Sequence, residues 1–222
     1  MYIWQGGVKI DSFLVTNELR FEFRLPVPEV CGGVTTVYHE GKAYNTVAIG
    51  AQCWLRENIN AGTRINGSQN MSNNGILEKY CYLDNEANCD IYGGLYQWNE
   101  AMRYTLTPGA QGICPLGWHI PTETEYRTLA ATVINNGNDL KSIGQGIGNG
   151  QGTNASGFSA LLAGYRFVDG SYNTLGEFAY FGSSSEHNSG AGKVMYLVHN
   201  ASGIVHSDLA KTYGLSIRCL KN

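Results

Sequence analysis

Six cysteines carry most of the reactive chemistry that the sequence offers. They stand at positions 31, 53, 81, 89, 114 and 219. No two of them have the C-x-x-C spacing of a zinc ribbon or a thioredoxin-type redox site. An even number without that spacing favours three disulfide bonds over six buried thiols. Disulfides persist in oxidising locations such as the periplasm, the cell surface, the extracellular medium or a virion.

The histidines do not form a catalytic motif. The five stand at positions 39, 119, 187, 199 and 206, and no pair has the H-x-x-x-H or H-E-x-x-H spacing of a metal-binding helix. The Gly-x-Ser-x-Gly-like segments lack the strand-to-helix elbow that a hydrolase nucleophile requires. We therefore predict no catalytic residue, no metal and no cofactor.

Two further segments match ligand-binding loops only in part. The glycine-rich stretch 144–150 follows no predicted strand and precedes no capped helix, so the geometry of a dinucleotide phosphate site is missing. Residues 84–90 alternate acidic and amide side chains as a calcium loop does, but Cys89 stands where an EF-hand needs glycine and Leu95 where it needs glutamate. We interpret this segment as a solvated loop held by a disulfide between Cys81 and Cys89. Whether the protein binds a structural calcium ion is not determined by the sequence.

The composition excludes several classes of partner. The chain has 222 residues, a length typical of one main domain, and 15% of them are charged, with a net charge of −3. No run of lysine and arginine exceeds two residues, so no nucleic acid is expected. No apolar run approaches the roughly 18 residues of a transmembrane segment. Aromatic residues at 11% and 29 glycines favour turn-rich β structure.

Residues 1–30 are predicted to be an N-terminal β extension or linker. Residues 19–25 alternate apolar and charged side chains as a strand does, and Pro26 and Pro28 follow as a linker. A boundary near Cys31 then separates this extension from a main domain over residues 31–222.

Local signals predict the first elements of the main domain. A β-hairpin is expected around residues 40–42, where Gly41 suits the turn. Helices are expected over 95–104 and 122–134, the second begun by a capping box of Thr122 and Glu125. The core face of the second helix follows three- and four-residue spacing, and its members are Tyr126, Leu129, Ala130 and Val133.

The second half is predicted to be a sheet of short strands beyond a long surface loop. Residues 135–157 are rich in glycine and have almost no apolar periodicity, which is typical of a loop. Short apolar segments bounded by Gly, Asn and Ser follow over 163–168, 177–185, 193–199, 203–208 and 215–221.

A series of seven motifs points to a protein family. In chain order they are YNTVAIGAQCWLREN (44–58), YCY (80–82), YGGLYQW (92–98), CPLGWHIP (114–121), SGFSAL (156–161), SSSE (183–186) and GLSIRC (214–219). Together they resemble the Fibrobacter succinogenes major paralogous domain over residues 31–222. The resemblance implies an α+β fold of the C-type-lectin-like class, close to formylglycine-generating enzymes and retroelement-diversified variable proteins. Two helices, small antiparallel sheets, long loops and adjoining chain ends are then expected.

The same resemblance assigns disulfides and core. It implies that Cys114 pairs with Cys219; we pair Cys81 with Cys89 by proximity, and Cys31 with Cys53. Four large rings lie inside the family motifs with apolar neighbours, so we expect them in the core rather than on a sugar-binding surface. They are Trp54, Trp98, Trp118 and Phe158.

We expect the chain to be a non-enzymatic ligand-recognition module on a cell surface, a secreted protein or a phage tail, with a protein or glycan as partner. The reason is an ordered scaffold with a polar, loop-rich C-terminal half, since binding residues are disproportionately on loops held by a rigid frame. A structural or adhesive surface module without its own pocket is one alternative, and an oxidase like the formylglycine-generating enzymes is another. The oxidase needs two closely placed late cysteines, whereas only Cys219 follows Cys114. Calcium-dependent sugar binding is rejected, because no Glu-Pro-Asn or Gln-Pro-Asp tripeptide occurs.

The ligand is expected on the stretch between the last two motifs, which corresponds to the substitutable segment of retroelement-diversified relatives. Residues 193–199 and 204–208 form a predicted hairpin joined by 200–203. Period-two alternation is expected to turn Leu197 inward and the recognition side chains toward solvent. The predicted ligand-binding residues are Lys193, Tyr196, His199, Asn200, His206, Asp208 and Tyr213.

Overall fold

The computed structural model describes residues 31–222 completely and, before them, the backbone of residues 2–5 and 8–12. Strands β1 (Tyr2–Gln5) and β2 (Val8–Ser12) pair antiparallel. The strand expected over 19–25 and the two prolines that follow it lie outside the described residues.

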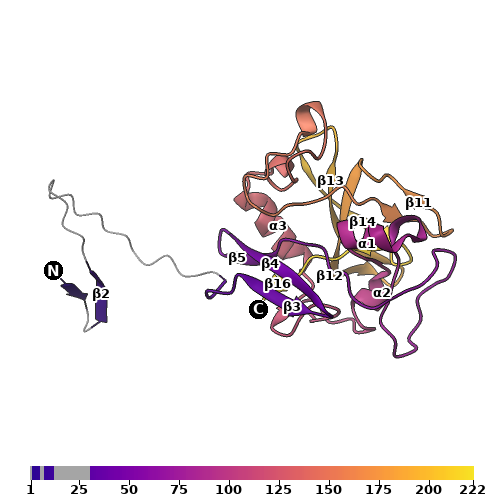
Figure 1. Ribbon diagram of the computed structural model, residues 1–222, viewed down its shortest axis with the longest axis horizontal. Helices are drawn as coiled ribbons and strands as arrows, with labels where there is room; N and C mark the ends of the chain where they lie inside the picture. The colour runs from indigo at the N-terminus through magenta and orange to yellow at the C-terminus, as the bar shows by residue number, and fades with distance from the viewer. Residues whose placement is uncertain (1, 6–7, 13–30) are drawn as a thin grey trace.

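One five-stranded sheet joins the start of the main domain to its end. Its order is β3 (Thr36–His39), β4 (Lys42–Ile49), β5 (Gln52–Leu55), β16 (Leu220–Lys221) and β9 (Trp118–His119). The predicted hairpin is confirmed, and its turn residues Glu40 and Gly41 have φ of 48° and 75°, the positive values that a type I′ turn requires. Leu220 pairs with Trp54, so the last strand lies beside β5 (Figure 1).

The other five-stranded sheet contains most strands predicted for the second half. Its order is β14 (Ile204–Ala210), β13 (Ala191–Val198), β12 (Phe178–Asn188), β15 (Leu215–Ser216) and β8 (Leu95–Tyr96). Strands β12, β13 and β14 form an antiparallel meander, whereas β15 runs parallel to β12. The predicted strand over 215–221 is divided between β15 and β16, one in each sheet.

Two short strand pairs complete the β structure of the main domain. The pair β10 (Tyr165–Arg166) and β11 (Tyr172–Asn173) is antiparallel, and the predicted strand over 163–168 is reduced to β10. The pair β6 (Thr63–Arg64) and β7 (Glu78–Lys79) is parallel.

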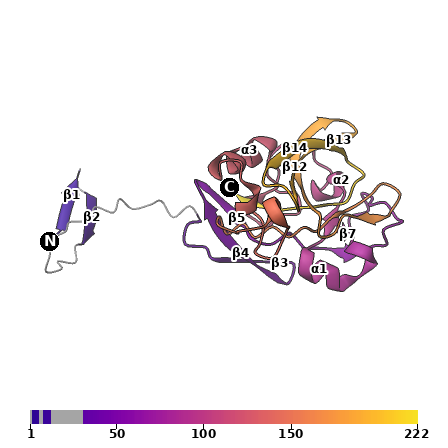
Figure 2. The same ribbon diagram turned by 90° about the horizontal axis from the view of Figure 1, so that it is seen from above.

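Helix α3 (Glu123–Thr132) is the predicted second helix with its capping box intact. The Thr122 hydroxyl accepts a hydrogen bond from the Glu125 amide, and the Glu125 carboxylate accepts one from the Thr122 amide at 2.8 Å. The four predicted core residues of this helix region are at most 9% exposed and pack in one cluster with side chains of β12 and β13. The view from above in Figure 2 shows α3 beside this meander.

The first predicted helix is wrong in extent. Leu95 and Tyr96 form β8 against β15, and helix α2 covers only Trp98–Ala101. Arg103 and Tyr104 have φ of 50° and 61°, values at which a right-handed helix ends. Pairing with a strand far along the chain therefore outweighs the local helical pattern.

A helix also forms where a solvated loop is expected. Helix α1 (Glu86–Tyr92) follows the 3₁₀ turn η1 (Tyr82–Asp84) and is capped by Asn85, whose side chain accepts a hydrogen bond from the Ala87 amide at 3.1 Å. The expected disulfide is present, but it joins this turn region to the helix. None of the helices in the described part of the chain has the length and apolar character needed to cross a bilayer.

The stretch 135–157 is a loop interrupted by two 3₁₀ turns, η2 (Gly137–Asp139) and η3 (Gly148–Gly150). Its glycines let the loop approach the end of β13. A Cβ at Gly146 or Gly150 would lie 2.6 or 2.2 Å from the carbonyl oxygen of His199. Close backbone packing thus accounts for glycine at these two positions.

All six cysteines form the three expected disulfides, Cys31–Cys53, Cys81–Cys89 and Cys114–Cys219. The four rings predicted for the core are buried, at 0 to 7% exposure. The Trp54 ring lies 5.5 Å from the rings of Tyr126 and Phe158, so strand β5, helix α3 and the segment before β10 share one aromatic centre.

His119 of β9 links helix α3 to the last residue of the chain. Its Nε2 lies 3.0 Å from Glu125 Oε1, and its Nδ1 lies 2.7 Å from Asn222 Oδ1. Burial alone would lower the pKa of His119, but these two hydrogen bonds and the Glu125 charge outweigh burial and raise it. Burial would raise the pKa of Glu125, but hydrogen bonds from His119 and Thr122 outweigh it and lower that pKa.

We expect this pair to stabilise the fold most at mildly acidic pH. The raised histidine pKa contributes stability below the usual value of 6.5, and the contribution is lost as pH rises through the folded value. The lowered pKa of the Glu125 carboxyl contributes stability at pH values above 4.5, its usual pKa, and this contribution is lost as pH falls through the folded value. The unfolding temperature of the wild type minus that of His119→Gln should therefore be largest between about pH 5 and 6.5 and decline at higher pH. A difference that stays constant from about pH 5 to 8 contradicts this assignment.

Candidate functional site

The predicted ligand-binding hairpin is present as β13 and β14. Lys193 pairs with Asp208, and Leu197 pairs with Ile204. Leu197 is fully buried, as expected. The turn between the strands holds Asn200, which is exposed.

Alternation along the hairpin divides the predicted site residues between two faces. Lys193 shares the face of Leu197, because residues separated by an even number point the same way. Tyr196 lies on the other face, where it pairs with Tyr180 of β12 and Val205 of β14. The expectation that the recognition side chains all stand opposite Leu197 is therefore corrected.

On the face toward α3, the predicted residues Lys193, His206 and Asp208 form a polar border to the core. The Asp208 carboxylate lies 2.8 Å from Lys193 Nζ and 3.2 Å from His187 Nδ1. The hydrogen bond to Asp208 raises the pKa of Lys193. Burial lowers the pKa of His206, and the charge of Arg127 acts in the same direction. The charges on this face are thus largely paired within the protein.

His199 is tied to the surrounding backbone at the end of β13. Its amide donates to the Glu177 carbonyl and its carbonyl accepts from the Ile147 amide, both at 2.7 Å. The side chain is half-buried. His199 therefore joins β13 to the glycine-rich loop and to the residue before β12.

Tyr196 and Tyr213 belong to a cluster of half-buried aromatic rings that we call the tyrosine face. Its six members are Tyr165, Phe167, Phe178, Tyr180, Tyr196 and Tyr213. The Tyr180 ring lies 5.0 Å from Tyr196 and 5.3 Å from Tyr165. The Tyr213 ring lies 5.5 Å from Tyr165 and 5.1 Å from Phe167. Each ring is held by its neighbours, mostly in tilted or edge-to-face contacts, so the surface is preorganised.

Four members of the tyrosine face carry phenol hydroxyls. Burial raises the pKa of Tyr180 to about 12, and the phenols of Tyr165, Tyr196 and Tyr213 act in the same direction. Burial also raises the pKa of Tyr165, with Tyr213 as the next cause. Within residues 31–222 none of these hydroxyls is hydrogen-bonded to another protein group, nor is any a fully buried orphan. They are accessible donors and acceptors on an otherwise apolar surface.

Sequence reasoning found only two of these six residues. Tyr165 and Phe167, like Phe178 and Tyr180, stand two residues apart, and aromatic side chains at that spacing on a strand share a face. The spacing therefore predicts two aromatic pairs, each on one face of a strand. Both pairs precede the stretch in which ligand contacts are expected, so the predicted site does not include them. Their meeting with the hairpin depends on strand pairing, through the bridge between Gly164 and Ala179.

A comparison with known families bears on the region that contains both sheets. The model of the Fibrobacter succinogenes major domain matches residues 47–221. The chain belongs to this family. No curated protein and no solved structure matches it. The matched residues, which we call the major domain, include the whole tyrosine face and the Cys114–Cys219 disulfide.

A polar groove of about 310 Å³ lies at one edge of the main domain (residues 31–222), between β4, the end of α1 and residues 142–161. Its charged lining residues include Lys42, Arg56, Glu57 and Asp90. Both Glu57 carboxylate oxygens accept hydrogen bonds from Asn45, at 2.8 and 2.9 Å. Arg56 donates to the Gly157 carbonyl and the Ser159 hydroxyl. These internal contacts already engage two of the charged groups in the groove.

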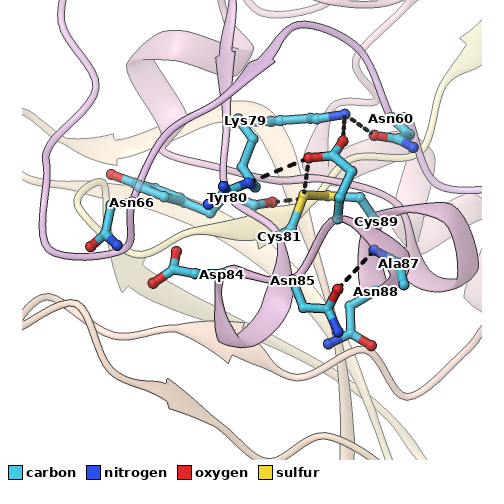
Figure 3. A network of polar contacts seen from close by, with 12 residues as sticks. Asn60, Asn66, Lys79, Tyr80, Cys81, Asp84, Asn85, Ala87, Asn88 and Cys89 are labelled. Atoms are coloured by element: carbon cyan, nitrogen blue, oxygen red, sulfur yellow. Dashed lines mark hydrogen bonds and ion pairs between the residues drawn. A yellow bond between two sulfur atoms is a disulfide. The ribbon is translucent and has the colours of Figure 1, made fainter.

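The Glu86 carboxylate lies beside the Cys81–Cys89 disulfide of the major domain. Figure 3 shows this disulfide with Lys79 and Asn60 nearby. The two sulfurs are bonded to each other, so they cannot act as the thiolates that bind a metal. The Glu86 carboxylate lies 2.9 Å from Lys79 Nζ and 3.4 Å from Arg64 Nε. Lys79 also donates to the side chain of Asn60 at 2.7 Å. This group is a structural ion-pair network around the disulfide.

The alternating polar residues at 84–90 have separate partners. The Asp84 carboxylate accepts hydrogen bonds from the Gly67 amide and the Tyr172 hydroxyl, at 2.8 and 2.7 Å. Asn88 donates to the Tyr82 carbonyl at 2.8 Å. With Glu86 paired to lysine and arginine, these side chains connect α1 to neighbouring segments rather than converging on one point.

Proposed function

We propose that the major domain is a non-enzymatic ligand-recognition module that binds through the tyrosine face. The observation that carries the proposal is the set of six half-buried rings held together on one side of the β12–β13 ladder. Tyrosine offers a large contact area at low cost in conformational entropy, and rigid aromatic anchors supply much of the energy of binding interfaces. Rings that are already locked by their neighbours lose little further freedom on binding.

The proposed site is centred on Tyr196 and Tyr213, with Asn200 and His199 at the hairpin end as further candidates. Lys193, His206 and Asp208 lie on the opposite face and are left out of it. The centre falls in the stretch that retroelement-diversified relatives would vary, so the same proposal covers a diversified receptor-binding surface.

We also propose that the fold is C-type-lectin-like and that the protein works outside the cell, on a cell surface or on a phage virion. Two observations support the fold. The last strand, β16, pairs with β5, and a disulfide joins Cys114 to Cys219, which lies between β15 and β16. Three disulfides support an oxidising location. Because every cysteine is in a disulfide, no thiol pair is left for copper, which favours recognition over oxidase chemistry.

An adhesive or structural role is the second candidate. Strand β14 is the outer strand of its sheet, and a seven-residue edge of this kind is able to pair with a strand from another chain. Self-association that is independent of the tyrosine face favours this role over ligand recognition.

Replacing Tyr196 or Tyr213 by alanine should weaken binding about fivefold or more in each case, because truncating an interface anchor costs about 1 kcal/mol or more. The full chain is applied to an array of glycans and of recombinant cell-surface proteins, and each hit is titrated with wild type and variants. Tyr38→Ala is the matched control, since Tyr38 is 80% exposed on β3 of the other sheet.

The unfolding temperature should fall by only a few degrees in the alanine variants. If either variant unfolds, the Tyr→Phe variants at the same positions keep the ring contacts and take its place. Hits that bind both alanine variants as tightly as the wild type contradict the proposed site.

A further inference from the structure

The tyrosine face contains a row of rings that runs across the strands. Tyr196, Tyr180, Tyr165 and Tyr213 follow one another with centroid separations of 5.0, 5.3 and 5.5 Å. The order follows from strand pairing. Tyr180 pairs with Tyr196, and β10 lies between β12 and the residue before β15, because Gly164 bridges to Ala179 and Arg166 to Gly214. The planes of neighbouring rings are inclined by 39°, 82° and 30°, so the row presents ring edges as well as ring faces. The separation of the rings is comparable to the length of one sugar ring, so consecutive units of an extended chain can each contact one ring.

The hydroxyls of this row discriminate between ligand classes. The four phenols belong to rings that contact one another in sequence, and none of their hydroxyls is hydrogen-bonded to another group of residues 31–222. An apolar peptide side chain laid over them would remove water from these hydroxyls without replacing its hydrogen bonds, which is unfavourable for each group. A polyol presents its own hydroxyls to the phenols and its C–H groups to the rings, so it satisfies both parts of the surface.

The charges around the row disfavour anionic ligands. Arg166, which follows Tyr165 in the sequence, is 1% exposed and donates to the carbonyl oxygens of Gly67, Gln69 and Thr212. Two exposed carboxylates border the row. The charge of Asp169 helps to raise the pKa of Tyr165, and Glu177 directly precedes Phe178. The face is therefore bordered by exposed carboxylates, and its buried arginine is already hydrogen-bonded to backbone carbonyls. Such a face repels sulfated, phosphorylated or acidic polymers.

From these observations we infer that the ligand of the tyrosine face is a neutral polysaccharide chain, bound without calcium by contact of its C–H groups with the rings of the row and by hydrogen bonds to their hydroxyls. This inference rests on the recognition role proposed above. It differs from a peptide or protein partner, which the same screen detects as a separate outcome.

Affinity electrophoresis with soluble polysaccharides tests the inference. The full chain is run through gels containing hydroxyethylcellulose, mixed-linkage β-glucan, xyloglucan, xylan or mannan, and through gels containing polygalacturonate or heparin. We expect at least one neutral polymer to retard the protein, the acidic polymers not to retard it, and neither EDTA nor added salt to release it.

Variants of the row distinguish the outcomes. Tyr180→Phe and Tyr196→Phe keep the ring contacts and remove one hydroxyl each, so affinity for the retarding polymer should fall about three- to tenfold, as loss of one hydrogen bond does. Tyr38→Phe on the other sheet should leave retardation unchanged. Retardation that is insensitive to the phenylalanine variants, or is abolished by EDTA, overturns the inference.

Failure of the inference is separable from failure of the recognition role. If no neutral polymer retards the chain while a surface protein binds it in a Tyr196- and Tyr213-dependent manner, the polysaccharide inference is wrong and the recognition role stands. If neither glycans nor proteins bind in a tyrosine-dependent manner, both are wrong.

Discussion

Replacing Arg218 by methionine is expected to lower the free energy of unfolding by about 3 to 5 kcal/mol. The side chain is 1% exposed, and its guanidinium stacks over the Phe158 ring at 4.4 Å. Burial lowers the pKa of Arg218 to about 10, so the group stays charged at neutral pH. Its hydrogen-bond acceptors are the carbonyl oxygens of Leu55, Arg56 and Phe158 and the side-chain oxygen of Asn58.

The physical reason is that methionine fills the volume but donates no hydrogen bond. Each buried acceptor left without a donor costs about 1 to 3 kcal/mol. Arg218→Lys should be intermediate, because it keeps the charge but loses the planar fork that reaches several acceptors at once. Since one guanidinium joins the end of β5 to the segment before β10, its loss should loosen both.

Urea unfolding of the variants measures this effect. Arg127→Met is the matched control, because Arg127 is 58% exposed and pairs with Glu123 one helical turn away. That substitution should cost no more than about 0.5 kcal/mol. A loss below about 1 kcal/mol in Arg218→Met contradicts the role assigned to the buried guanidinium.

Removing the Cys114–Cys219 disulfide by double alanine substitution is expected to cost about 4 to 5 kcal/mol in a chain-entropy model. The two residues are 105 apart in sequence, so the cross-link closes a long loop in the unfolded chain. The free energy of unfolding of a typical domain is about 5 to 15 kcal/mol, so a loss of this size is a large fraction of it. The variant should therefore be partly unfolded at physiological temperature.

The short disulfide provides the control for this experiment. Cys81 and Cys89 are separated by 8 residues, and the same model gives about 2.5 kcal/mol for their removal. Non-reducing peptide mapping by mass spectrometry first establishes the pairs. A Cys114 peptide linked to any cysteine other than Cys219, or equal losses of stability for the two double variants, contradicts the prediction.

Several elements were predictable because their signals are local. Helix α3 follows from a capping box and a spacing of apolar residues that lie within a dozen positions, and the β3–β4 hairpin follows from a two-residue turn with glycine at its second position. The strands of the meander follow from short apolar segments bounded by turn residues. The number of disulfides followed from the even count of cysteines and the Cys81–Cys89 pair from proximity, whereas the Cys114–Cys219 pair and the buried tryptophans were implied by the family resemblance.

Other features were decided by tertiary contacts. Local sequence predicts a helix over 95–104, but pairing of Leu95 and Tyr96 with β15 confines the helix to Trp98–Ala101. Helix α1 forms over a polar stretch whose apolar periodicity is weak, because Asn85 caps its start and a disulfide holds it. Propensity is a weak preference that a partner strand or a cross-link readily overrides.

The candidate site shows the same division. By itself the sequence determined that residues 193–208 form a hairpin with Leu197 buried. The choice of Tyr196 and Tyr213 as ligand-binding residues stays a prediction. Only the tertiary structure decided that Lys193 and Asp208 face α3 while both tyrosines join rings from residues 165–180. The reason is that alternation relates side chains within one strand, whereas which strands become neighbours depends on burial and hydrogen bonding summed over the whole chain.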